Sequence, residues 1–419
     1  MKKSFRWLFW GLLLVLVMGS LVSAKREVRW MQWKTSEVGQ AVMDEIKATF
    51  EAENPDITLT IIDSPFTGFR DKAITLHRAR HSPDVLMIQV DWLVEFAEMG
   101  VIQPLDPFVA KSDVLEEIFP IFKQKWKDNL YALPLHSGCV ALFYNIDIFQ
   151  KEGIAGPPTT WDEFVEIAKK VTKPEENQYA VTATLQLEPP TNLTYDIFPL
   201  IFQFGGEIFD EETNRVVFNS PEGVRAIEFY VDLINKHQIA VPGVLSNGEK
   251  EKRGNFAAGN IAMMFEGPWG IAIQQNLNPN LNFMTAPLPR GITDGTVVRG
   301  SLNTITTQAK DPDAAWKFIE FISGPVGNAI WSRHTGDFPA RRDVAEMDFF
   351  RQNPMAQAFI EQMSRPNAGS PNLGLPESIR LNKILTSAIQ SAVLGEKTVQ
   401  QALDEAAAEW ESVLAPYFQ

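Results

Sequence analysis

The chain of 419 residues has a single cysteine, Cys139, and only five histidines. One cysteine excludes an internal disulfide, and we expect Cys139 to be a buried structural thiol. His77 and His81 alone have the i, i+4 spacing that places two ligands on one helix face, but the residues between them lack the glutamate of a metalloprotease. The sequence therefore predicts no metal site.

The chain also lacks the common catalytic and cofactor motifs. It contains no serine-nucleophile elbow, no phosphate-binding glycine loop and no dinucleotide fingerprint. We accordingly expect no catalytic residues, no cofactor and no enzymatic activity. One enzymatic alternative stays open, because a glycosidase needs only two carboxylates and the chain has 52 aspartates and glutamates.

Basic residues are fewer than acidic ones, 38 against 52, so the formal net charge is −14 at pH 7. This balance argues against nucleic acid and anionic membrane surfaces as partners. The chain has enough hydrophobic residues, 45%, to bury a sizeable core and is longer than single domains usually are, so two lobes are expected. We expect the protein to be a monomer.

Residues 1–24 have the pattern of a secretion signal. Basic residues precede the apolar stretch Trp7–Met18, and small residues lead to a cleavage point after Ala24. The apolar stretch is short for a membrane span of about 20 residues. Because no cysteine lies near this point, a lipid-modified N-terminus is excluded. We therefore expect cleavage near Ala24 and a soluble periplasmic protein that is not a lipoprotein.

Apolar strands alternate with amphipathic helices along the first hundred residues. The expected strands are 27–33, 57–61 and 84–90, and the expected helices are 38–50, 69–79 and 92–99. This alternation predicts an α/β fold whose lobes are mostly parallel sheets flanked by helices. The last part of the chain, 377–414, instead predicts two helices separated at Gly395.

Tryptophans follow apolar strands at three places, Trp33, Trp92 and Trp269. Open α/β sheets bind ligands where their strands end. An aromatic face suits the C–H surface of a sugar, whose hydroxyls need carboxylates, amides or guanidiniums beside it. Glu266 precedes the Gly-Pro-Trp turn that carries Trp269, so we expect it to accept sugar hydroxyls at the rim. Arg341 and Arg299 are candidate hydroxyl donors, with a surface ion pair as the alternative role for each.

Four segments, taken in order, carry a family resemblance. They are "SPDVLMIQVDWLVEFAEMGVIQPLD", "YALPLHSGCVALFYNIDIFQKEGIAGPPTTWDEFVEIAKKVT", "FAAGNIAMMFEGPWG" and "GDFPARRDV". Together they make the chain similar to the extracellular solute-binding proteins of bacterial ABC importers, in their carbohydrate-binding branch. The resemblance implies the type II periplasmic-binding-protein fold, in which a ligand cleft lies between two lobes joined by three crossings. It also implies capture of a mono- or oligosaccharide by hinge closure and delivery to a membrane permease.

The resemblance sets the expected lobe boundaries. The N-terminal lobe takes residues 25–138 with 288–338, and the C-terminal lobe takes 139–287 with 339–419. Proline-bearing stretches near 288 and 338 are typical of crossings between lobes.

Several site residues follow from the maltose-binding members of that branch. Their sugar-contacting aspartate matches Asp91, and their stacking tryptophan of the Gly-Pro-Trp turn matches Trp269. Tyr195 matches a sugar-contacting tyrosine, and a polar pair after the first strand falls near Trp33 and Lys34.

This sequence also departs from those members. Trp92 stands where they have an arginine, and Gly138 stands where they have an acidic residue, which leaves His136 and Ser137 as polar candidates. Another stacking tryptophan falls near Asn382. These differences weaken the case for maltose itself and leave the sugar class intact. A polyamine, organic phosphate or metal chelate remains an alternative ligand, although the sequence does not visibly concentrate the cations that a phosphate requires.

Overall fold

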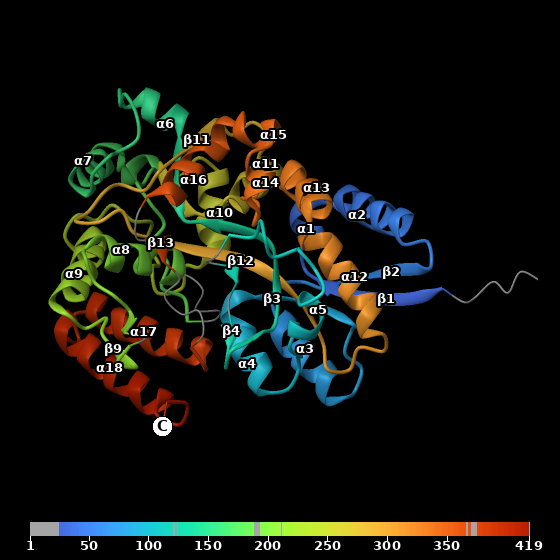
Figure 1. Ribbon diagram of the computed structural model, residues 1–419. Helices are drawn as coiled ribbons and strands as arrows, with labels where there is room; N and C mark the ends of the chain where they lie inside the picture. Colours follow the sequence, from blue (N-terminus) through green and yellow to red (C-terminus); the bar gives the residue numbers. More distant parts are fainter. Residues whose placement is uncertain are drawn as a thin grey trace, which may run out of the picture.

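The computed structural model describes residues 25–119, 122–123, 125–187, 193–210, 212–365, 368–369 and 375–418. The predicted signal, residues 1–24, lies outside the described residues. Within the described part of the chain, no helix is long and apolar enough to cross a membrane. Strands at the centre of the molecule are flanked by helices on both sides (Figure 1), which confirms the α/β class.

The first sheet contains the predicted N-terminal strands. Its order is β13-β12-β3-β1-β2, with β6 also paired to β12. Strands β1, β2 and β3 are parallel, whereas β12 is antiparallel to both β3 and β6. The strands are β1 Arg26–Gln32, β2 Ile57–Asp63, β3 Val85–Gln89, β6 Leu133–Cys139, β12 Thr296–Ile305 and β13 Ala368–Gly369.

Helices of the first and last thirds of the chain pack on this sheet. They are α1 Thr35–Val38, α2 Gln40–Glu53, α3 Phe69–Arg78, η1 Val90–Trp92, α4 Leu93–Glu98, α5 Asp106–Val109, α12 Pro312–Ser323 and α13 Pro325–Thr335. Helices α2, α3 and α4 confirm the three predicted helices. A two-stranded hairpin of β4 Lys125–Trp126 and β5 Asn129–Leu130 lies apart from the sheet.

The second sheet has the order β10-β7-β11, formed by Met263–Glu266, Ala141–Asn145 and Phe283–Ala286. Strand β7 is antiparallel to both neighbours, so the prediction of a mostly parallel sheet is wrong here. Only Val140 separates β6 from β7, so the chain enters the second sheet directly from the first sheet. Parallel neighbours require a helical crossover, and none precedes β7.

Helices surround the second sheet. They are α6 Ile146–Lys151, α7 Trp161–Val171, η3 Pro174–Glu176, η4 Leu193–Ile197, α8 Phe198–Gln203, α9 Pro221–Asn235, α10 Glu249–Ala257, α11 Trp269–Leu277, α14 Arg342–Ala345, α15 Asp348–Arg351, α16 Pro354–Ser364, α17 Ser378–Val393 and α18 Val399–Leu414. The last two confirm the predicted C-terminal pair, with Gly395 at φ 72° between them. A hairpin of β8 Phe209–Asp210 and β9 Arg215–Val216 completes the set.

Two large hydrophobic cores lie on either side of β6 and β12. Leu135 and Val298 belong to the first core, whereas Val297 and Val140, the residue directly after β6, belong to the second. Each strand therefore passes from one core to the other within a few residues. A third stretch of chain, at Phe338, runs between the cores beside these two strands, because Ser137 of β6 forms an isolated β-bridge with Phe338. In Figure 1, β12 spans the middle of the molecule. Cys139 is buried here, as predicted.

Candidate ligand-binding site

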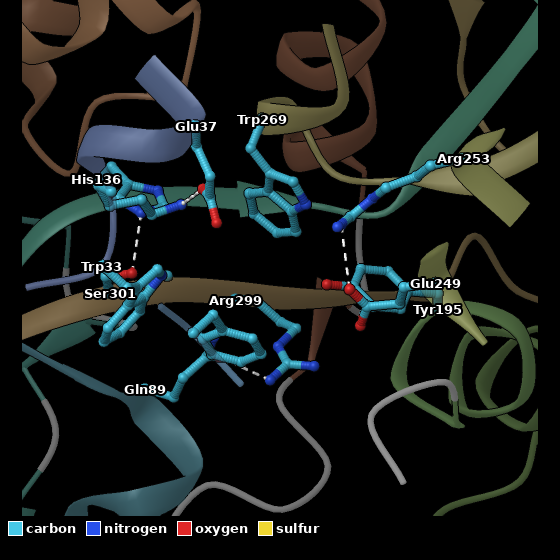
Figure 2. Close-up of a pocket in the computed structure, with 13 residues that line it drawn as sticks. Trp33, Glu37, Gln89, His136, Tyr195, Glu249, Arg253, Trp269, Arg299 and Ser301 are labelled. Atoms are coloured by element: carbon cyan, nitrogen blue, oxygen red, sulfur yellow. Dashed lines mark hydrogen bonds and ion pairs between the residues drawn. The ribbon is translucent and has the colours of Figure 1, made fainter. Parts of the chain in front are cut away.

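A pocket lies where the two cores face each other. Its empty volume is about 490 Å³, counted with its opening to solvent, which falls in the usual range for small-molecule sites. The lining residues come from both sides (Figure 2) and are Trp33, Lys34, Glu37, Phe66, Gln89, His136, Tyr195, Glu249, Arg253, Trp269, Arg299, Gly300 and Ser301. Six of the predicted residues, Trp269, Trp33, Lys34, Tyr195, His136 and Arg299, are among them.

Trp269 is the first residue of α11 and projects into the pocket (Figure 2). Its indole Nε1 donates a hydrogen bond of 2.9 Å to Oε1 of Glu266. Glu266 itself is fully buried at the end of β10. The structure thus places Glu266 behind the ring and away from the predicted position at the rim.

Arg253 of α10 connects Glu266 to the pocket. Its Nε lies 2.9 Å from Oε2 of Glu266, and its Nη2 lies 3.2 Å from Oε2 of Glu249. Burial alone would raise the pKa of Glu266, but the cations of Arg253 and Lys252 lower this pKa to about 2. Glu266 is therefore ionised at neutral pH and offsets part of the positive charge of Arg253 and Lys252.

Arg299 of β12 stands between Asp91 and the pocket. Its Nη2 donates 2.8 Å to Gln89 Oε1 and 3.4 Å to Asp91 Oδ1. Its guanidinium carbon also lies 5.7 Å from the ring centroid of Tyr195. Asp91, predicted to contact the ligand, is not a lining residue and instead orients the arginine that is.

Trp92 is placed beneath the pocket floor. Its ring packs against Trp33, Phe66 and Phe96 at centroid distances of 5.7, 6.0 and 6.1 Å. Trp33 is 1% exposed, and it lines the pocket together with Phe66. Because this aromatic cluster surrounds Trp92, the ring supports the floor and does not face the pocket as predicted.

Lys34 reaches toward the opposite side of the pocket. Its Nζ lies 2.6 Å from Oε2 of Glu37 and 5.8 Å from the ring centroid of Trp269. On the other side, Tyr195 is buried, with Lys252 Nζ 4.5 Å from its ring centroid, and its ring meets Trp269 edge-on. Burial raises the pKa of Tyr195 well above its usual value, so its hydroxyl stays protonated.

His136 belongs to a series of buried polar side chains that links the three stretches running between the cores. Its Nε2 lies 3.0 Å from Ser301 Oγ on β12, and its Nδ1 lies 3.4 Å from Asp337 Oδ2. That carboxylate accepts 2.9 Å from Trp331 Nε1. Burial lowers the pKa of His136 and raises that of Asp337 to about 6. The imidazole is therefore neutral at pH 7.

Two other predicted residues lie outside the pocket lining. Arg341 is buried, pairs with Asp343 through both carboxylate oxygens and donates to the main-chain oxygen of Val114. These contacts occupy the guanidinium N–H groups that were expected to donate to a sugar hydroxyl. Asn382 is buried in α17, where its main-chain oxygen accepts from Thr386.

Gly138 departs from the expected acidic residue for a steric reason. A Cβ added there would lie 2.5 Å from Cδ of Pro268 and 3.2 Å from Cζ3 of Trp269. Strand β6 therefore packs directly on the turn that carries the indole. A side chain at position 138 could not fit without moving that turn.

Sequence reasoning missed seven lining residues. Glu249 and Arg253 stand in a polar helix that resembles a solvated surface, and only the fold brings this helix against the end of β10. The one available signal was their i, i+4 spacing, which is typical of an ion pair. Sequence reasoning also saw no concentration of cations, yet the fold gathers three. The missed residues are Glu37, Phe66, Gln89, Glu249, Arg253, Gly300 and Ser301.

The described residues contain no group of three or more His, Cys, Asp or Glu side chains placed to hold a metal ion. The lining side chains offer instead two partly exposed aromatic rings, Trp269 and Phe66, together with three cations and two carboxylates. Such a set can hold a polar ring through its face and its hydroxyl groups.

Comparisons with known proteins identify the family of this chain. Residues 32–329 match the family model for bacterial extracellular solute-binding proteins. A putative binding protein of Brucella abortus is 27% identical, with 93% of each chain covered. The maltotriose-binding protein of Pyrococcus abyssi is 26% identical, covering 79% of this chain and 70% of that one. The sn-glycerol-3-phosphate-binding periplasmic protein of Escherichia coli is 24% identical, with 88% of each covered.

Two solved structures are similar to this chain over nearly its whole length. An ABC transporter solute-binding protein from Thermotoga lettingae, bound with α-D-tagatose, superposes with a TM-score of 0.83 and 25% identity, covering 93% of this chain and 100% of that one. Maltose-bound MalE3 of T. maritima gives a TM-score of 0.79 at 25% identity, with the same coverage.

Proposed function

We propose, from the premise that this chain belongs to the family of bacterial extracellular solute-binding proteins, that it captures a mono- or oligosaccharide between its lobes. As a component of an ABC importer, it would then deliver the sugar to the membrane permease. The observation that carries the proposal is the placement of Trp269 beside Arg253 and Glu249, which offers a ring face together with hydroxyl donors and acceptors.

The positions of the lining residues support closure around the ligand. Trp33, Lys34 and Glu37 come from the side of the first core, and Tyr195, Arg253 and Trp269 from the side of the second. A sugar that contacts both sets binds the closed form more tightly and shifts the population toward it. We propose that the permease recognises this form, and that the protein acts as a periplasmic monomer after removal of residues 1–24.

We keep the lobe boundaries at 138 and 338 as proposals. Leu288 and Val297 both pack in the second core, which favours moving the boundary predicted at 288 to the neighbourhood of Val297. The hinge would then consist of the adjacent parts of β6, β12 and the stretch at Phe338.

A phosphate ester is the second candidate ligand, because Lys34, Arg253 and Arg299 all line the pocket and one relative is named for sn-glycerol-3-phosphate. Each of these cations, however, has a carboxylate partner, namely Glu37, Glu249 with Glu266, and Asp91. An arriving phosphate would be repelled by those carboxylates or would have to displace them. The pairing favours an uncharged sugar.

The experiment is a thermal-shift screen of the purified mature protein. The panel contains glucose, mannose, tagatose, maltose and maltotriose, together with glycerol 3-phosphate and spermidine. A ligand that binds only the folded state raises the melting temperature by mass action. We expect a shift from at least one sugar and none from the phosphate or the amine. A shift from glycerol 3-phosphate alone would establish the second candidate.

A further inference from the structure

Glu266 contacts two ligand-facing groups at once, although it is itself fully buried. Its Oε1 accepts 2.9 Å from Trp269 Nε1 and 3.2 Å from the main-chain N–H of Gly267. Its Oε2 accepts 2.9 Å from Arg253 Nε. One carboxylate therefore fixes both an indole and a guanidinium that line the pocket.

The indole is held on one side by its own turn. A Cβ added to Gly267 would lie only 2.2 Å from Cζ2 of Trp269, so the ring lies directly against the main chain of Gly267. With the turn beneath it and Glu266 holding Nε1, the ring has little freedom to rotate. In Figure 2 its nitrogen points toward the Arg253 guanidinium.

Arg253 is held as firmly on its inner side. Glu266 occupies its Nε, and Nη2 lies within 3.3 Å of Glu266 Oε1 as well as 3.2 Å from Glu249. A bidentate arrangement of this kind fixes the plane of the guanidinium as well as its position.

We propose that Glu266 is a positioning residue that sets the indole of Trp269 and the guanidinium of Arg253 as one unit. One ring of the ligand would then be bound on its face by Trp269 and along its hydroxyl edge by Arg253. The inference rests on the proposed sugar-binding function. It assigns to Glu266 the orientation of the site and no contact with the sugar.

The test compares Glu266→Gln with Asp196→Asn. Gln keeps the shape of Glu266 and an acceptor for one donor, but removes the charge that holds Arg253. Asp196 is a matched control, because it is buried near the same Lys252, 3.9 Å from its Nζ, and no hydrogen bond or ion pair joins it to Trp269 or Arg253. Dissociation constants are measured by calorimetry with the tightest sugar of the panel above.

We expect Glu266→Gln to weaken binding by about tenfold or more, the size of one charge-assisted hydrogen bond, while Asp196→Asn stays within about threefold. Affinity of Glu266→Gln within about threefold of wild type would overturn the proposal, as would an equal loss in both variants. If Glu266→Gln does not fold, Trp269→Phe removes the Nε1 bond and keeps an aromatic ring. Unchanged affinity in that variant would also overturn it.

A second readout needs no ligand. The indole N–H resonance of Trp269, identified by its loss in Trp269→Phe, should shift in Glu266→Gln and keep its position in Asp196→Asn. A resonance that does not move in Glu266→Gln contradicts the inference. Failure of the wild-type protein to bind any sugar would instead contradict the proposed function, so the two failures are distinguishable.

Discussion

The Oγ of Ser378, at the start of α17, donates a 2.8 Å hydrogen bond to the main-chain oxygen of Asp91 in η1. Helix α17 packs in the second core, and η1 follows a strand of the first sheet. At another point of the same boundary, Asn276 Nδ2 of α11 donates 3.3 Å to the main-chain oxygen of Glu37. These two bonds join the halves of the molecule beside the pocket.

Ser378→Ala should therefore weaken sugar binding without touching the sugar. If the bond exists only in the closed form, its loss costs that form about 1 kcal/mol, which corresponds to a dissociation constant raised about fivefold. Calorimetric titration measures the effect. Ser391→Ala, which removes a hydroxyl bonded within the same helix to Ala388, serves as control, and equal affinities for the two variants would argue against a role in closure.

Gly138→Ala should disturb both stability and binding. The added Cβ would press on Pro268, 2.5 Å away, and displace the turn that carries Trp269. Overpacking of this kind costs about 1 to 3 kcal/mol of unfolding free energy. Urea denaturation and sugar titration give the two quantities. Gly156→Ala is the control, since a Cβ there meets nothing within 4 Å. A Gly138→Ala protein as stable as wild type would contradict the packing described.

Trp92→Phe should lower the free energy of unfolding and leave the affinity for the sugar nearly unchanged. The ring supports the floor among Trp33, Phe66 and Phe96, so a smaller ring leaves a gap that costs about 1 to 3 kcal/mol. We expect the dissociation constant for the sugar to stay within about threefold of wild type. A large loss of affinity at unchanged stability would mean that Trp92 faces the ligand after all.

Asp337 should make stability depend on pH between about 4 and 6. Burial raises its folded-state pKa from the ordinary 3.8 to about 6, although Lys34 opposes this rise. The folded protein keeps a proton that the unfolded chain loses in this window, so stability falls as pH rises through it. Asp337→Asn cannot titrate and still accepts from Trp331. The opposite contribution of His136, whose pKa burial lowers, is present in both proteins.

We expect the unfolding free energy of Asp337→Asn, relative to wild type, to rise by about 2 to 3 kcal/mol between pH 4 and pH 7. Urea denaturation at several pH values gives the difference. A difference that does not vary with pH would show that folding does not raise the pKa of Asp337.

The sequence predicted the elements better than their directions. Periodicity identified β1, α2, β2, α3, β3 and α4 because each buries one face or both faces in a regular pattern. The antiparallel β7 could not be predicted in this way, since its direction depends on the crossing that delivers it. Alternation of strands and helices carries no information about where the chain passes between lobes.

The site was predicted in part for a similar reason. Trp269 and Trp33 were found because aromatic residues at strand ends are visible in the sequence. Glu266 was correctly singled out as a neighbour of Trp269 but given the wrong role, because burial depends on α10 covering the end of β10. Arg253 was missed, since nothing local distinguishes it from a solvated arginine.

The most direct test of the account is the affinity of Trp269→Ala for the tightest-binding sugar, measured by calorimetry beside wild type and Trp126→Ala. Trp126 is a control because its indole bonds to Glu98, away from the pocket. We expect Trp269→Ala to bind about thirtyfold more weakly or worse, the effect of removing an aromatic anchor worth about 2 kcal/mol, while Trp126→Ala binds as wild type does. Equal affinity of Trp269→Ala and wild type, with both proteins folded, would contradict the central claim that a sugar binds on this ring.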